Sequence, residues 1–171
     1  MNRPGSSPLD PHTCSQEKPD AVEHVRKAKA MSTTWTQPAQ ALISEATAGW
    51  EGIWSLTYAA GFGALNLAMS VPLGVGVSIS YAAMDFRDAQ DELEWARPNL
   101  RTTATAVRFG HVRDVDDAAQ ARAILDQLAA AALDRAAALS EIELDLSDQA
   151  ALSRVMARLI TGRAKVTGRW A

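Results

Sequence analysis

One run of 33 residues without a charged side chain, Gly52–Met84, constrains the fold more than any other feature of the sequence. Glu51 precedes the run and Asp85 follows it. About a quarter of the residues in an ordinary globular domain are charged. An uncharged run of this length therefore indicates either contact with lipid or burial by protein on every side.

The length of the run limits how it can enter a membrane. The hydrocarbon core of a bilayer takes about 20 helical residues, so the run is too long for one straight span and too short for two. A span from about Leu56 to Ser78, kinked at Pro72, fits this length. A shallow re-entrant hairpin that turns near residues 70–72 also fits.

Aromatic and basic residues near the run support a membrane segment. Three aromatic residues at the start of the run have the positions of interfacial anchors: Trp50, Trp54 and Tyr58. Trp170 has the position of a fourth anchor, at the end of the basic C-terminal segment. Within about 20 residues of the run, basic side chains occur only on its C-terminal side, at Arg87, Arg97 and Arg101. This bias predicts a membrane protein whose C-terminal domain is cytoplasmic. The alternative is a cytoplasmic protein without membrane contact.

The second half of the run carries two overlapping patterns. Between Val71 and Tyr81 apolar residues alternate with Pro, Gly and Ser, which is typical of a strand. Small residues also recur at every fourth position, a spacing that lets membrane helices approach closely. These are Ser70, Gly74, Ser78 and Ala82, and we predict self-association through them.

The whole chain is predicted to be mainly α-helical, in three parts. Residues 1–36 form a disordered or weakly helical tail, 37–84 an apolar helical or membrane segment, and 85–171 an acidic helical domain. The clearest helix covers about residues 115–140. A last amphipathic helix begins near Ser147 and is expected to stop at Gly162. The alternative fold is a small soluble α+β domain with a buried strand at 71–81, paired with 102–112.

Charge is distributed unevenly along the chain. Residues 85–148 contain 14 acidic and seven basic side chains, whereas residues 149–171 contain five basic and no acidic ones. The basic surface consists of Arg154, Arg158, Arg163, Lys165 and Arg169. Such a helix either lies on an anionic membrane or packs into a bundle and pairs with the acidic segment. The formal net charge of −3 argues against a nucleic-acid partner.

The sequence offers no set of residues for catalysis, for a metal or for a cofactor. Cys14 is the only cysteine, and the three histidines, His12, His24 and His111, are scattered. Gly74 and Gly76 lack the further residues of a phosphate-binding loop. The acidic residues lack the spacing and the glycine of a calcium-binding loop. We therefore expect a protein that is not an enzyme and has no cofactor.

Two short motifs resemble those of the WXG100 class of secreted helical hairpins. Trp50-Glu51-Gly52 is similar to the W-x-G turn of that class, and Tyr81-Ala82-Ala83-Met84-Asp85 to the Y-x-x-x-D tail signal of related secreted proteins. The resemblance implies that W-x-G joins two long amphipathic helices. It also implies that the tail signal follows the second of these helices.

These observations predict a membrane-associated structural or assembly protein that self-associates through its apolar segment. It would serve as an anchor, as a subunit of a larger assembly or as a small pore of the phage-holin type. Its partners would be membrane lipid and further copies of itself. One alternative is a soluble α+β interaction module, and another is a WXG100-like secreted helical protein.

Overall fold

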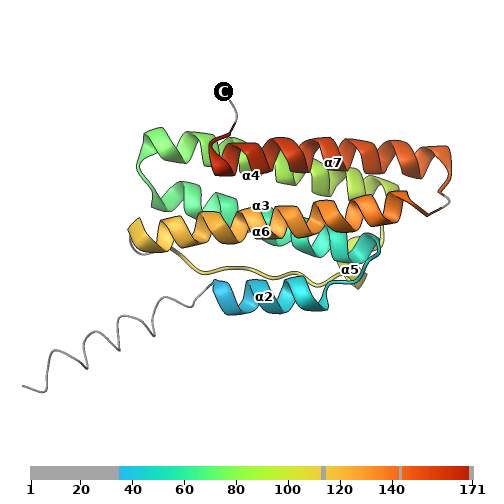
Figure 1. The fold of residues 1–171 in the computed structure, drawn as a ribbon, viewed down its shortest axis with the longest axis horizontal. Helices are drawn as coiled ribbons and strands as arrows, with labels where there is room; N and C mark the ends of the chain where they lie inside the picture. The colour runs from blue at the N-terminus through green and yellow to red at the C-terminus, as the bar shows by residue number, and fades with distance from the viewer. Residues whose placement is uncertain (1–34, 113–114, 143, 170–171) are drawn as a thin grey trace, which may run out of the picture. The chain divides into compact units, whose positions relative to one another are not determined.

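The computed structural model describes residues 35–112, 115–142 and 144–169. This part of the chain is helical and contains no strand, which confirms the mainly α prediction (Figure 1). The helices are α2 (Thr36–Glu45), α3 (Trp50–Ser70), α4 (Leu73–Ala96), α5 (Leu100–Thr103), α6 (Val115–Ser140) and α7 (Leu146–Thr167). The predicted tail up to residue 34, with Cys14, and the predicted anchor Trp170 lie outside the described residues.

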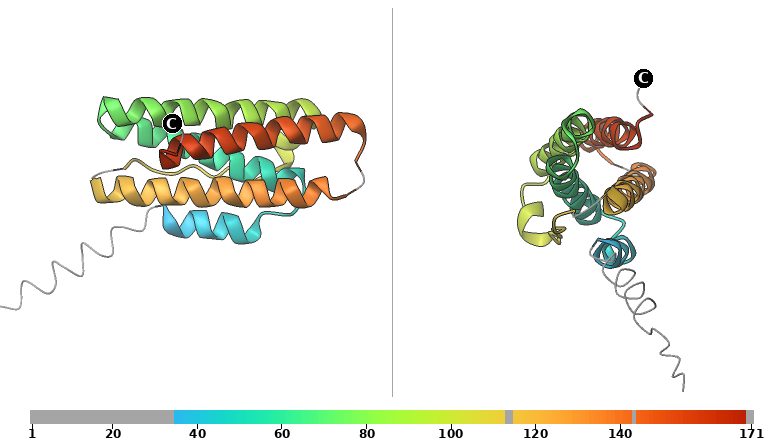
Figure 2. Two further views of the ribbon diagram at one scale, coloured as in Figure 1. Left: turned by 45° about the horizontal axis from the view of Figure 1, so that its top comes forward. Right: turned by 90° about the vertical axis from the view of Figure 1, so that its left-hand side faces the viewer.

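The four long helices form a bundle in which every neighbour is antiparallel. α3 packs against α4 and α6, and α7 packs against the same two helices (Figure 2). α4 and α6 are diagonal to each other and run in the same direction, so the chain returns along the bundle between them. A long crossover of this kind is one of the standard connections of four-helix bundles.

The uncharged run forms α3 and the first half of α4. α3 ends at Ser70 and α4 begins at Leu73, so the chain turns at residues 71–72, where the hairpin alternative placed its turn. Most apolar side chains of α3 are enclosed by protein: Ile53, Leu56, Ala60, Ala64 and Leu67 are fully buried. Among the described residues, no helix is long and apolar enough to cross a membrane. The predicted single kinked span is therefore not observed.

The predicted strand at 71–81 is wrong, because α4 begins at Leu73. The buried positions there are Gly76, Ile79, Ala82 and Phe86, a helical spacing. A β-carbon at Gly76 would lie 2.6 Å from the carbonyl oxygen of Ala68. Glycine thus allows α3 and α4 to approach closely just after the turn.

The second predicted strand, at 102–112, is also absent. α5 takes up its first residues, and the following residues cross along α3 without a strand partner. The backbone N–H of Thr105 donates to Ser55 Oγ at 3.0 Å, and the Asn66 side chain donates to the Phe109 carbonyl at 2.8 Å. Side chains of α3 therefore supply hydrogen bonds that a sheet would otherwise supply.

The bundle contains residues of both the predicted apolar segment, residues 37–84, and the predicted acidic helical domain, residues 85–171. The boundary between these two parts falls inside α4, and Phe86 just beyond it is fully buried. α7 begins after Asp145, whose carboxylate accepts from the Asp148 N–H, and it runs past Gly162. A β-carbon at Gly162 would lie 2.8 Å from the Phe86 ring, so this glycine makes room for the ring. The helix ends instead at Gly168, whose φ is 72°.

Candidate functional site

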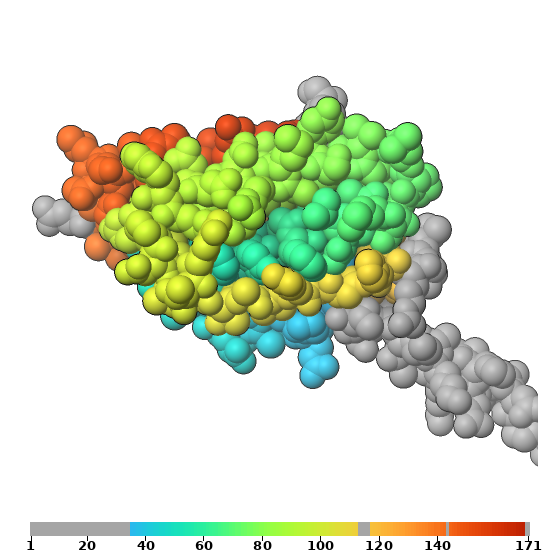
Figure 3. Space-filling model, turned by 180° about the vertical axis from the view of Figure 1, so that it is seen from behind, coloured from blue at the N-terminus to red at the C-terminus, as the bar shows by residue number. Residues whose placement is uncertain are grey.

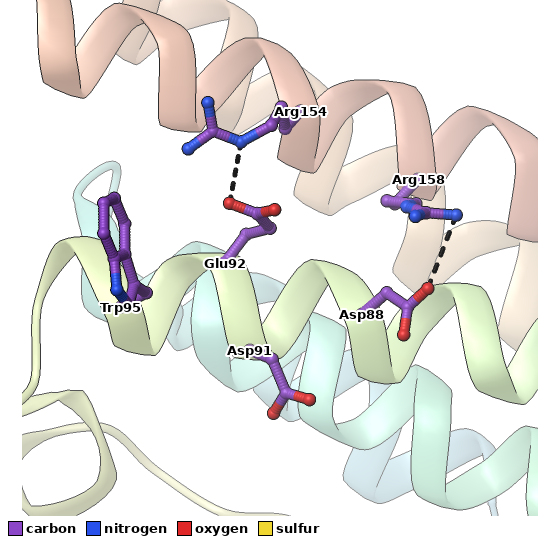
Figure 4. A pocket seen from close by; sticks show the side chains of 6 residues that line it. All are labelled: Asp88, Asp91, Glu92, Trp95, Arg154 and Arg158. Atoms are coloured by element: carbon purple, nitrogen blue, oxygen red, sulfur yellow. Dashed lines mark hydrogen bonds and ion pairs between the residues drawn. The ribbon is translucent and has the colours of Figure 1, made fainter.

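The predicted basic surface pairs with the acidic segment inside the bundle. Arg154 Nε lies 2.8 Å from a carboxylate oxygen of Glu92, and Arg158 lies 3.4 Å from Asp88 (Figure 4). Lys165 donates to the buried Asp85 at 2.6 Å. Arg163 pairs with Asp126 of α6, and Arg169 is exposed beyond α7. The bundle-packing alternative for this helix is therefore observed.

An open recess between α4 and α7 contains part of this charge. It has a volume of about 590 Å³ and is lined by Asp88, Asp91, Glu92, Trp95, Arg154 and Arg158 (Figure 4). Glu92 and Asp88 face the two guanidinium groups, whereas Asp91 points away from α7 and pairs with Arg87 at 3.1 Å (Figure 4). The charges therefore largely offset one another. No group of three His, Cys, Asp or Glu residues in the described ranges is placed to hold a metal ion.

Two of the predicted interfacial anchors make hydrogen bonds inside the folded chain, one to α4 and one to the crossing segment after α5. The Trp54 indole N–H donates to Glu94 at 3.0 Å, and the Tyr58 hydroxyl accepts from Arg108 Nε at 2.8 Å. The Trp50 ring lies beneath the Arg97 guanidinium, 4.8 Å from its centroid. All three aromatic residues thus make contacts within the bundle.

Several donors converge on the carboxylate of Glu94. Gln90 donates to it at 2.7 Å and Arg101 at 2.6 Å, in addition to Trp54. Burial raises the pKa of Glu94, but the three hydrogen bonds and the charge of Arg101 together hold this pKa below its ordinary value. The ionised carboxylate is therefore favoured by the fold.

Glu94 is expected to make the free energy of unfolding depend on pH. A pKa that is lower in the folded chain contributes stability above the unfolded value of about 4.3, and this contribution disappears as pH falls through the folded value. At pH 7, Glu94→Gln should be less stable than the wild type, and the difference should shrink between about pH 5 and pH 3. Urea unfolding of both proteins at each pH measures it. A difference that stays constant over this range would contradict the role of the charge.

The four small residues predicted for self-association have different surroundings. Ala82 is fully buried, and Ser78 Oγ donates to the Lys165 carbonyl of α7 at 3.1 Å. Ser70 and Gly74 are exposed on either side of the turn. Half of this stripe therefore contacts α7 in the bundle, and the other half remains on the surface.

Exposed apolar side chains concentrate on the α3–α4 hairpin. Among the residues that the structure describes, seven of the eleven exposed large hydrophobic side chains lie between residues 65 and 84: Leu65, Met69, Leu73, Val75, Val77, Tyr81 and Met84. The sequence signal for them was the uncharged run itself. Burial accounts for most of its α3 half, and the seven exposed side chains are the part that burial does not explain.

A groove separates the exposed faces of the two hairpin helices. We call it the hairpin groove; its volume is about 460 Å³ and its floor and walls are largely apolar. The lining residues are Tyr58, Gly61, Phe62 and Leu65 of α3 with Ser80, Ala83, Met84, Arg87, Asp88 and Gln90 of α4. Figure 3 shows this face, with α4 and α3 side by side and the crossing segment next to α3. Sequence reasoning did not identify the groove as a surface, because it forms only when the two helices pack together.

The two motifs of the WXG100 resemblance occupy other positions than the resemblance implies. Trp50-Glu51-Gly52 begins α3, after the ten-residue helix α2, and so does not join two long helices. Tyr81 and Asp85 lie in the middle of α4, and the Asp85 carboxylate is buried against Lys165. No family model, curated protein or solved structure matches the chain.

Proposed function

We propose that the protein is a structural or assembly component that self-associates through the hairpin groove. The observation that carries this proposal is the largely apolar groove between α3 and α4, whose lining includes the exposed side chains of Leu65 and Met84. Large exposed apolar patches on folded proteins mark interaction sites. The proposal assigns the chain no catalytic step.

A second copy of the chain fits the groove because the surface is self-complementary. Its centre is apolar, with Phe62 and Leu65 on one wall and Met84 on the other. Its rim carries adjacent side chains of opposite charge, Arg87 and Asp88. A two-fold axis through the groove would bring Arg87 of each copy near Asp88 of the other while the apolar walls meet. This arrangement would join two hairpins into a larger helical bundle.

Met84→Asp is expected to weaken the dimer strongly. Burial of a methionine side chain contributes about 1.5–3 kcal/mol, and a two-fold interface contains the residue twice. We therefore expect the dissociation constant to rise by at least about 100-fold. Sedimentation equilibrium of the full chain over a range of concentrations measures this change.

Ile160→Asp provides the matched control. Ile160 lies on α7 and is 58% exposed, against 60% for Met84, so both changes place a carboxylate at an equally accessible helix position. The control should keep the wild-type dissociation constant. A wild-type chain that stays monomeric at every concentration, or an equal effect of both substitutions, would refute the groove as the interface.

A further inference from the structure

The turn of the hairpin forms a second apolar surface, distinct from the groove. We call residues 69–77 the hairpin tip. Leu73 is 82% exposed and Met69 is 65% exposed, and a β-carbon at Gly74 would meet no atom within 4 Å. The tip is thus a convex apolar protrusion, whereas the groove is concave. We propose that the hairpin tip inserts into the interfacial region of a lipid bilayer.

The distribution of charge along the hairpin allows this insertion. The first charged residue after the tip is Asp85, 12 residues beyond Leu73, which corresponds to about 18 Å of helix. The nearest one before it is Glu51, 18 residues before Met69, or about 27 Å. Interfacial apolar elements enter a bilayer by about 5–10 Å, so no charge of the hairpin would reach the hydrocarbon.

The tip lies at the end of the bundle where α6 also begins, and it extends beyond the last turn of α7 (Figure 1). Ser78 Oγ donates to the carbonyl of Lys165, two residues before the end of α7 at Thr167. Because α4 and α7 are antiparallel, the residues of α4 before Ser78 lie beside the last turn of α7 and beyond it (Figure 1). Arg169 follows the end of α7 and is exposed, a position at the level of lipid headgroups when the tip is inserted.

Two polar groups of the tip, the Pro72 carbonyl and the Ser70 hydroxyl, have partners within the hairpin itself. The carbonyl of Pro72 accepts from the N–H groups of Val75 and Gly76, both at 2.9 Å, and proline has no N–H of its own. The Ser70 hydroxyl donates to the Asn66 carbonyl at 2.8 Å. Since unsatisfied polar groups make transfer into lipid costly, these bonds favour a bilayer as the occupant.

Burial of the apolar side chains of the tip is expected to drive binding to lipid vesicles. The formal net charge of −3 gives the chain no general attraction to anionic lipid. We therefore expect binding to zwitterionic phosphatidylcholine vesicles, with little change between low and high salt. Added phosphatidylglycerol should not strengthen it.

A fluorescent label at the tip tests insertion directly. Gly74→Cys in a Cys14→Ser background places a single thiol at the tip, and Ala150→Cys places one on an exposed position of α7. With an environment-sensitive dye on each, phosphatidylcholine vesicles should shift the emission of the tip label to the blue and leave the α7 label unchanged. Equal spectra for the two labels, or no shift in either, would overturn the proposal.

Two leucine substitutions test the contribution of the tip to vesicle binding. Leu73 and Leu146 are the first residues of α4 and α7 and are 82% and 84% exposed, at opposite ends of the bundle. Aspartate is favourable in the first turn of a helix, so both variants should fold. Leu73→Asp should reduce vesicle co-sedimentation at least tenfold, and Leu146→Asp should leave it unchanged.

The same variants distinguish this proposal from self-association at the groove. Leu73→Asp should keep the wild-type dissociation constant of the dimer, and Met84→Asp should keep the blue shift of the tip label. If Leu73→Asp dissociates the dimer and vesicle binding is absent, the tip contacts a second copy and insertion into lipid is refuted.

Discussion

Phe86→Ala should lower the free energy of unfolding by about 3–5 kcal/mol, the usual cost of removing a buried aromatic ring. Phe86 is fully buried, and its ring packs against Gly162 of α7. Gly61 of α3 also lies close to it, with a built β-carbon 3.4 Å from the β-carbon of Phe86. Phe86 therefore lies close to both α3 and α7, and loss of its ring would leave a cavity against α7. A typical domain is stable by only about 5–15 kcal/mol, so much of that margin would be lost.

Urea unfolding followed by circular dichroism at 222 nm measures this loss. Ile160→Ala is the matched control, because Ile160 is 58% exposed on α7 and lies outside the hairpin groove. Truncation of an exposed side chain should change stability by no more than about 0.5 kcal/mol. Equal effects of the two substitutions would mean that α4 does not present Phe86 to the core.

Sequence patterns predicted α6 correctly, because it has one exposed polar face. They did not reveal that α3 is surrounded by protein and not by lipid. The predicted helix at 115–140 agrees with α6, because its apolar residues recur at helical spacing and its other face is polar. α3 lacks such a polar face. α4, α6 and the crossing segment all contact it, and an enclosed helix has the same composition as a helix in lipid.

The strand prediction failed where local pattern and tertiary packing disagree. Between Val71 and Tyr81 the β-branched residues alternate, yet Val75 and Val77 are both exposed and only every third or fourth position is buried. The packing of Gly76 against α3 and of Phe86 against α7 stabilises a helix there. Such contacts join distant parts of the chain, and no local window of the sequence contains them.

Only part of the candidate site was accessible to sequence reasoning. The uncharged run identified the hairpin, but its composition fitted both contact with lipid and burial by protein. The pairing of Arg154 with Glu92 and of Lys165 with Asp85 requires α4 and α7 to be neighbours, and nothing in the spacing of these residues specifies that. The groove likewise depends on how α3 and α4 pack.

Gly52→Ala should destabilise the protein, whereas Gly74→Ala should stabilise it. A β-carbon at Gly52 would overlap the backbone carbonyl oxygen of Thr47, in the connection between α2 and α3. Alanine would gain up to about 1 kcal/mol from its helix propensity, but the connection would have to move. We expect a net loss of at least about 2 kcal/mol, as for other overpacked sites. At Gly74 the space is open, so the gain of about 0.5–1 kcal/mol from propensity should remain.

The two substitutions are chemically identical, so alanine's helix propensity favours both. A loss of stability at Gly52 with a gain at Gly74 would therefore measure the contact with Thr47. Urea unfolding of both variants and of the wild type supplies the comparison. A stabilising Gly52→Ala would show that residues 46–49 do not pack over the first turn of α3. A destabilising Gly74→Ala would show that the tip is covered in the folded protein, and it would count against both its exposure and its insertion into lipid. The matched glycine pair therefore tests the core at one end of α3 and the accessibility of the hairpin tip at the other.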